Sequence, residues 1–149
     1  MTAQALNLPF ARAEYDARLA KVHAEMGERG LDVLIVTDPS NMNWLTGYDG
    51  WSFYVHQCVL IALHGDPVWY GRGQDENGAL RTCYMHQQDI ISYADEYVQS
   101  AERHPMDYLS ARIESRGWAS ARIGVEMDNY WFSAAAYASL IRHLPSAKF

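Results

Sequence analysis

The sequence contains few of the residues that mark disulfide-rich or zinc-binding proteins. Cys58 and Cys83 are its only cysteines, and they lie far apart without a CxxC spacing. A disulfide framework and a structural zinc site both require more closely grouped cysteines. We therefore expect two reduced thiols in the core.

Long apolar runs are also absent from the sequence. The longest, such as residues 33–36 and 59–63, are far shorter than the roughly 20 residues that a membrane helix needs. The first residues lack the basic segment, the apolar core and the small-residue cleavage site of a secretion signal. We therefore expect a cytoplasmic protein that does not bind a membrane.

Basic residues are scarce relative to acidic ones. Twelve Lys and Arg stand against eighteen Asp and Glu, which gives a net charge of -6, and the basic residues form no run. A nucleic-acid partner is therefore not expected, because phosphate binding depends on clustered positive charge. The hydrophobic fraction of 49% in 149 residues is sufficient for one domain with a real core, spanning residues 1–149.

Apolar residues at helical spacing predict five helices, several of them with a recognisable start or end. Gly30 is placed to end the first helix in a left-handed conformation, and Asp38 followed by Pro39 is placed to begin the second. The predicted helices cover residues 11–29, 39–46, 75–86, Pro105 up to Gly117, and Ser133 up to Pro145.

Five β-rich runs alternate with these helices, at residues 33–36, 57–63, 68–70, 90–93 and 123–126. Residues 65 and 66, Gly followed by Asp, predict a type II′ turn that joins the second and third runs as a hairpin. Because the hairpin is antiparallel whereas the rest alternates strand and helix, the sheet should be mixed. The predicted fold is α/β, with a mixed central β-sheet, an antiparallel hairpin and helices on both faces.

The segment of residues 44–54 has an unusual composition, with five aromatic side chains in eleven residues and Asp49 between two glycines. Aromatic faces and a carboxylate together attract a cationic or amidinium-like group, so the segment can form a pocket wall. We expect Trp44 and Phe53 to pack on the sheet instead. For Asp49, Trp51 and Tyr54, ligand binding and ordinary packing remain open alternatives.

His56 lies two residues before Cys58, but this pair does not predict a nucleophilic enzyme. Residues 57–63 read as a buried strand, in which a thiol acts as a small hydrophobic group, and the sequence spacing suggests no third group to orient the histidine. His56 is instead either a hydrogen-bond donor to a ligand or a structural histidine.

The remaining histidines do not predict a metal site. They are scattered, with no HxH or HExxH spacing and no Asp at ligand distance in sequence. The residues concerned are His23, His64, His86, His104 and His143. We expect neither a metal nor another cofactor in this chain.

Several stretches together resemble the N-terminal domain of the creatinase/prolidase group of pita-bread hydrolases. The resemblance extends from residue 11 to residue 144. It rests on Tyr15-xx-Arg18, Met26-xxx-Gly30-Leu31-Asp32-Val33-Leu34-Ile35, Asp38-Pro39-Ser40-Asn41, Trp44-Leu45-Thr46-Gly47-Tyr48 and Ile123-Gly124-Val125-Glu126. Within the group, residues 46–54 are most similar to ectoine hydrolases, which open the ring of a cyclic amidine.

The resemblance implies that this chain is one part of a larger enzyme. In the family the reaction takes place in a C-terminal domain, usually at a divalent metal, and the chain contains no such domain. The N-terminal domain of one subunit reaches the active site of its partner in a homodimer. By resemblance, no residue here is catalytic, and the substrate-binding residues would be Asp49, Trp51, Tyr54 and His56, which would close over a small-molecule substrate shared with the partner.

Two other functions remain open. The chain can be a non-enzymatic module that binds a small molecule or a protein, or the N-terminal domain of an X-Pro peptidase, whose members have a similar Leu45-Thr46-Gly47 turn. The residues that follow Phe149 in the gene would discriminate between an enzyme and a module, since an enzyme needs Asp, His and Glu there.

Overall fold

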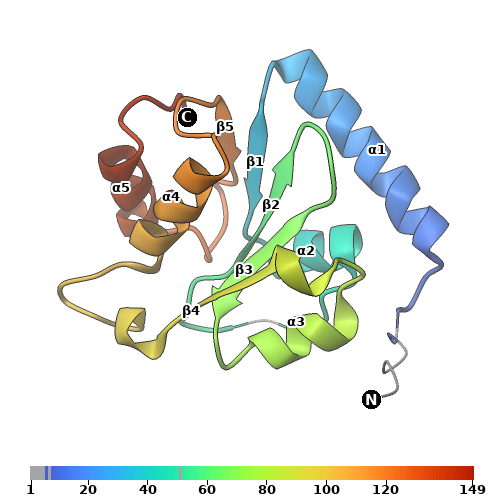
Figure 1. Cartoon of the computed structure of the whole chain (residues 1–149), viewed down its shortest axis with the longest axis horizontal. Helices are drawn as coiled ribbons and strands as arrows, with labels where there is room; N and C mark the ends of the chain where they lie inside the picture. The colour runs from blue at the N-terminus through green and yellow to red at the C-terminus, as the bar shows by residue number, and fades with distance from the viewer. Residues whose placement is uncertain (1–5, 7, 51) are drawn as a thin grey trace.

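The computed structural model describes residue 6, residues 8–50 and residues 52–149, and these residues form a five-stranded sheet between helices (Figure 1). The strand order is β4-β3-β2-β1-β5. The strands are β1 (Val33–Val36), β2 (Cys58–Ala62), β3 (Val68–Arg72), β4 (Ile90–Tyr93) and β5 (Ile123–Val125). The predicted mixed sheet is confirmed.

The strand directions bring most of the loops of interest to one edge of the sheet. β1 is parallel to β5, β3 is parallel to β4, and β2 is antiparallel to both β1 and β3. Hence the carboxyl ends of β1, β3, β4 and β5 lie at the same edge as the start of β2. Below, we call this the carboxyl edge of the sheet.

Helices cover both faces of the sheet, as predicted (Figure 1). One face is covered by α1 (Arg12–Arg29), α2 (Pro39–Thr46) and α3 (Glu76–Thr82), and the other by α4 (Pro105–Ser115) and α5 (Ala134–His143). Two short 3-10 turns, Gln87–Asp89 and Asp95–Tyr97, flank β4.

Each face has its own hydrophobic core, because alternate strand residues point to opposite sides. In β3, Trp69 packs in the core beneath α1, α2 and α3, whereas its neighbour Tyr70 packs in the core beneath α4 and α5. Cys58 and Cys83 are both buried free thiols, as expected.

The predicted helix ends are largely confirmed by the backbone. Gly30 adopts the left-handed conformation at φ 64°, and the Leu31 N–H donates to the Met26 carbonyl at 2.8 Å. The Asp38 carboxylate accepts hydrogen bonds from the Ser40 and Asn41 N–H groups, which caps α2. Among the described residues, no helix is both long and apolar enough to cross a membrane.

The predicted type II′ turn is wrong, although the hairpin itself is present. Cys58 pairs with Tyr70 and Leu60 with Val68, so five residues, 63–67, connect the strands. The Leu63 N–H donates to the Asp32 carbonyl at the start of β1, and Pro67 has no N–H to donate. Pairing between β2 and β3 therefore stops before a two-residue turn can form.

The helix predicted for residues 75–86 is also too long, since α3 ends at Thr82. Cys83 is extended, and the Tyr84 N–H donates to the Thr46 carbonyl at the end of α2. This contact between distant segments replaces the last predicted turns of the helix.

Candidate functional site

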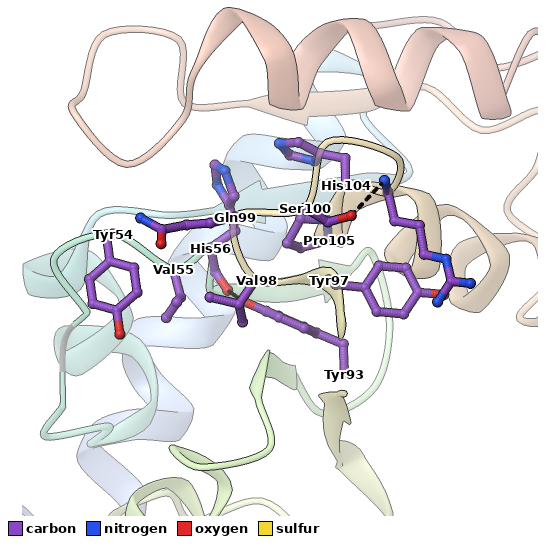
Figure 2. A pocket seen from close by; sticks show the side chains of 11 residues that line it. Tyr54, Val55, His56, Tyr93, Tyr97, Val98, Gln99, Ser100, His104 and Pro105 are labelled. Carbon is purple, nitrogen blue, oxygen red and sulfur yellow. Dashed lines mark hydrogen bonds between the residues drawn. The ribbon is translucent and has the colours of Figure 1, made fainter. Parts of the chain in front are cut away.

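The carboxyl edge of the sheet carries a pocket of about 200 Å³ (Figure 2). Two segments form it: residues 54–56, shortly before β2, and the stretch from the end of β4 to the start of α4. Its lining residues are Tyr54, Val55, His56, Tyr93, Tyr97, Val98, Gln99, Ser100, Arg103, His104 and Pro105. We call it the edge pocket.

Two imidazole rings lie next to each other in this pocket. The ring centroids of His56 and His104 are 4.6 Å apart, and Figure 2 shows both side chains projecting to the same side. Burial lowers the pKa of His56 to about 4, with a further contribution from His104, while a hydrogen bond to the Trp131 backbone opposes this shift. Burial likewise lowers the pKa of His104. Both rings are therefore neutral at pH 7.

His104 has a second role, at the start of α4. Its Nδ1 accepts the Met106 N–H at 3.1 Å, and the Asp107 carboxylate accepts the His104 N–H at 2.8 Å, which completes a capping box. Since Nδ1 is an acceptor here, the proton of the neutral ring is on Nε2.

Tyr54 lies at the mouth of the pocket and is 56% exposed. Its hydroxyl is 3.5 Å from Arg72 Nη1. The Arg72 guanidinium also donates two hydrogen bonds to Asp95, at 2.7 and 2.9 Å, which lowers the pKa of that carboxyl. The ends of β3 and β4 thus provide a polar support for Tyr54. The Arg72 guanidinium thus binds a carboxylate of the chain itself.

Gln99 and Ser100 shape the far wall of the pocket. Among the described residues other than glycine, Gln99 is the one with a positive φ, at 51°. Such strain is retained where surrounding structure enforces it, often at functional sites. The Ser100 hydroxyl accepts the N–H groups of Glu102 and Arg103 and so stabilises the turn into α4.

The structure separates Asp49 from Tyr54 and His56. Asp49 is exposed, and it lines a different hollow of about 330 Å³ beside the start of α2, together with Ser40, Asn43 and Tyr48. Its N–H donates to the Thr82 hydroxyl at 3.1 Å. Tyr54 and His56 share the edge pocket. Trp51 lies outside the described residues.

The prediction that Trp44 and Phe53 pack on the sheet is wrong. Trp44 is 42% exposed and Phe53 84% exposed. Trp44 lies beside the Arg18 guanidinium, 5.2 Å from its ring centroid, and its carbonyl accepts a hydrogen bond from Arg18 at 2.9 Å. Phe53 lies in the bend that precedes β2, where no strand directs its side chain inward. Phe53 and Tyr54 therefore present aromatic surface beside the edge pocket.

The surroundings of Cys58 disfavour a reactive thiol, and the acidic, histidine and cysteine side chains of the described residues are not grouped as a metal ion requires. Burial raises the pKa of the Cys58 thiol, and the nearby Glu126 raises it further, so the reactive thiolate is disfavoured. Among the described residues, no group of three or more His, Cys, Asp or Glu side chains could hold a metal ion.

Sequence reasoning missed part of the pocket. From the sequence, His104 stands out only as a possible metal ligand, although its position before Pro105 is a signal for a helix start. Gln99 gives no local signal, because its left-handed conformation is imposed by the surrounding structure. Glu126, part of the resemblance, is a structural acceptor for the N–H groups of Thr37 and Asp38, at 2.6 and 2.8 Å.

Comparison with known proteins places these features in context. Residues 18–149 match the model of the Creatinase/Prolidase N-terminal domain family. Over 145 residues the chain is 61% identical to ectoine hydrolase of Halomonas elongata, a match that covers 97% of this chain and 36% of that protein. The chain spans about a third, 36%, of the length of the curated relatives that it matches.

Solved structures share the fold at low sequence identity. A proline dipeptidase from Streptococcus pneumoniae matches with a TM-score of 0.70 and 19% identity, over 89% of this chain and 88% of that one. The Creatinase/Prolidase N-terminal domain of an X-Pro dipeptidase from Streptococcus pyogenes, whose structure was solved as a separate domain, matches with a TM-score of 0.67 and 16% identity, over 89% and 92% of the two chains. These matches confirm the predicted fold class.

Proposed function

The chain belongs to the creatinase/prolidase N-terminal domain family, and on this premise we propose that it is the substrate-gating and dimerisation domain of a C–N bond hydrolase. The substrate would be a small cyclic amidine such as ectoine. The identity of 61% to an ectoine hydrolase supports this choice of substrate class. Residues 1–149 would form the N-terminal domain, and the catalytic residues would lie in a C-terminal domain.

The observation that carries the proposal is the exposed pair of aromatic residues, Phe53 and Tyr54, next to the edge pocket. A folded chain gains free energy by burying aromatic rings, so neighbouring rings that remain in solvent indicate a surface made for contact. Phe53 and Tyr54 are such rings, and the loop that contains them begins beside Asp49. In a homodimer, this segment would cover the active site of the partner subunit and exclude water from it.

The individual residues would act on the substrate in different ways. Tyr54 and Trp51 would contact the amidinium plane, and Asp49 would accept a hydrogen bond from its nitrogen. Because Asp49 is outside the edge pocket, it would meet a different part of the substrate from Tyr54 and His56. His56, which is neutral at pH 7 and donates its N–H to the Trp131 backbone, would accept a hydrogen bond without adding charge.

The described residues offer no ligand set for a divalent metal. If the parent enzyme uses such a metal, we propose that its C-terminal domain holds it. We propose that the protein is located in the cytoplasm, because its proposed substrate is a small cytoplasmic solute.

The test is an assay of ectoine ring opening by the full-length parent enzyme. We expect Asp49→Ala, Trp51→Ala and Tyr54→Ala each to lower kcat/KM by about tenfold or more, equivalent to the loss of one or two polar or aromatic contacts at about 1.4 kcal/mol per factor of ten. Glu28→Ala, an exposed carboxylate on α1, is the matched control and should leave the kinetics unchanged. Unchanged kinetics in all three site variants would refute the gating role.

Dimerisation is tested separately on the same full-length protein. Sedimentation should give the mass of two subunits, and mixing a variant defective in this domain with a variant defective in catalysis should restore about a quarter of the activity through hybrid dimers. A monomer that is fully active would contradict the proposal. Turnover of an X-Pro dipeptide in place of ectoine would favour the peptidase branch.

A further inference from the structure

The geometry points to the edge pocket as a binding site for a small carboxylic acid, with the carboxylate beside His104 and the rest of the molecule against the tyrosine rings. The inference deepens the proposed function and rests on it only for the identity of the acid. It adds His104 and Gln99 as ligand-binding residues.

The hydrogen-bond donors in the pocket lining are not balanced by negative charges. His104 Nε2–H, the Gln99 amide and the hydroxyl of Ser100 are neutral donors, and Arg103 adds a guanidinium. The lining residues of the pocket include no Asp and no Glu. A cavity lined by donors without a carboxylate of its own is complementary to an oxygen anion from outside.

The paired histidines are both held in the neutral form. Two imidazolium ions with ring centroids 4.6 Å apart would repel each other, and burial already disfavours the charged form of both rings. His104 therefore presents a neutral Nε2–H, whereas the one N–H of the neutral His56 ring is donated to the Trp131 backbone. The charged groups that face His104 are Asp107 and Arg142, and these pair with each other at 3.3 Å.

The pocket lining also contains one guanidinium cation, that of Arg103. Arg103 forms an ion pair with Glu96, outside the lining residues, and its guanidinium lies 5.9 Å from the Tyr97 ring centroid. Both partners of this ion pair are about half exposed, so the pair contributes little stability and can open toward a ligand. A single cation suits a monocarboxylate better than a phosphate dianion, which is usually held by several cations.

The pocket is small, and tyrosine rings form part of its walls. About 200 Å³ has room for roughly seven water-sized groups, at about 30 Å³ each, which is smaller than the pockets that bind drug-sized ligands. Tyr93 and Tyr97 pack edge to face, with centroids 6.3 Å apart, and present apolar surface to one side of the space. Figure 2 shows Tyr54 and Gln99 toward one end and Tyr97 toward the other. These walls fit a compact ring that carries one carboxylate.

The test is a titration of the chain by isothermal calorimetry and by amide chemical shifts, with three probes. These are ectoine, 2-methyl-1,4,5,6-tetrahydropyrimidine, which is the same amidine ring without the carboxylate, and proline. The structure of a related N-terminal domain solved separately supports using the chain alone. Ectoine should bind at least about tenfold more tightly than the ring without the carboxylate, with shifts concentrated at residues 54–56 and 93–105.

Variants connect the binding to the histidine pair. His104→Asn retains a good helix cap but removes the imidazole, so it should weaken carboxylate binding about fivefold or more while the fold is kept. Gln99→Gly keeps the left-handed backbone without the amide and should weaken binding as well. His64→Asn, at an exposed position in the loop between β2 and β3, is the matched control.

The outcomes separate this inference from the proposed function. Binding of both acids, or of proline alone, supports the carboxylate site, and binding of proline without ectoine would refute ectoine as the substrate. Equal binding of ectoine and the ring without the carboxylate, or no binding of either acid, would overturn the inference. Binding that both His104→Asn and Gln99→Gly leave unchanged would overturn it too.

Discussion

Where the segment before β2 meets the start of α4, two histidines behave differently from histidines in water. A histidine in an unfolded chain has a pKa of about 6.5, whereas the folded structure lowers the pKa of His56 to about 4. The cause is burial first and the neighbouring His104 second. The ionisation of His56 is therefore a property of the folded chain.

This difference predicts how stability depends on pH. Below about pH 6.5 the unfolded state binds a proton at His56 that the folded state does not, so the free energy of unfolding falls as the pH decreases from 6.5 toward 4. The stabilising contribution is complete above pH 6.5. The urea midpoint of the unmodified chain should thus fall more steeply between pH 7 and pH 5 than that of His56→Phe. The carboxylates contribute equally to the pH dependence of both proteins. If the urea midpoints of the two proteins change in parallel with pH, the prediction is contradicted.

At the scale of elements, the junction between α2 and α3 depends on one glycine. Gly47 ends α2 at φ 81°, and a Cβ there would lie 2.7 Å from the Thr82 carbonyl oxygen. The chain offers a comparison, because Gly117 has the same φ of 81° but no atom within 4 Å of the corresponding Cβ position. Gly117 is therefore needed only for its left-handed backbone, whereas Gly47 also allows the close packing of α2 and α3.

We therefore expect the two alanine variants to differ in stability. Gly117→Ala should cost about 1 kcal/mol, from the left-handed backbone. Gly47→Ala should cost at least about 2 kcal/mol more, because α2 or α3 must shift to relieve the overlap with backbone. Urea unfolding at neutral pH measures both values. Similar losses in the two variants would show that α3 does not restrict this position.

At the scale of the whole molecule, the carboxyl edge is held together by contacts between segments far apart in the sequence. Glu126, just after β5, accepts hydrogen bonds from the Thr37 and Asp38 N–H groups and from Asn41 Nδ2, at 2.6 to 2.8 Å. These bonds join the end of β5 to the start of α2. They also hold the end of β5 in place. The Trp131 backbone, which follows in the chain, is hydrogen-bonded to His56.

Removal of this carboxylate should weaken the domain as one unit. Glu126→Ala should lower the free energy of unfolding by about 2–4 kcal/mol, because hydrogen bonds to a charged group contribute about 1.5–3 kcal/mol each and are not additive. Glu126→Gln keeps an acceptor oxygen, so its free energy of unfolding should lie between that of Glu126→Ala and that of the unmodified chain. Circular dichroism and tryptophan fluorescence should report one shared transition. A loss no larger than that of Glu28→Ala would contradict the structural role.

Much of the fold could be predicted because the signals are local. Helical spacing, the left-handed Gly30 and the Asp38 cap depend on residues within a few positions of one another, and these predictions are confirmed. The early end of α3 was not predictable in this way. It depends on the Tyr84 N–H reaching Thr46, on a segment far away in the sequence.

In the candidate site, too, some features depend on local sequence signals and others on contacts between distant segments. The sequence by itself determined the order of helices and strands, the family resemblance and the aromatic segment, since each is encoded in neighbouring residues. Only the tertiary structure decided that Tyr54 and His56 share a pocket with Gln99 and His104, and that Asp49 lines another hollow. The physical reason is that strand direction and register bring distant segments to one edge of the sheet, and packing there sets the ionisation and exposure of each side chain.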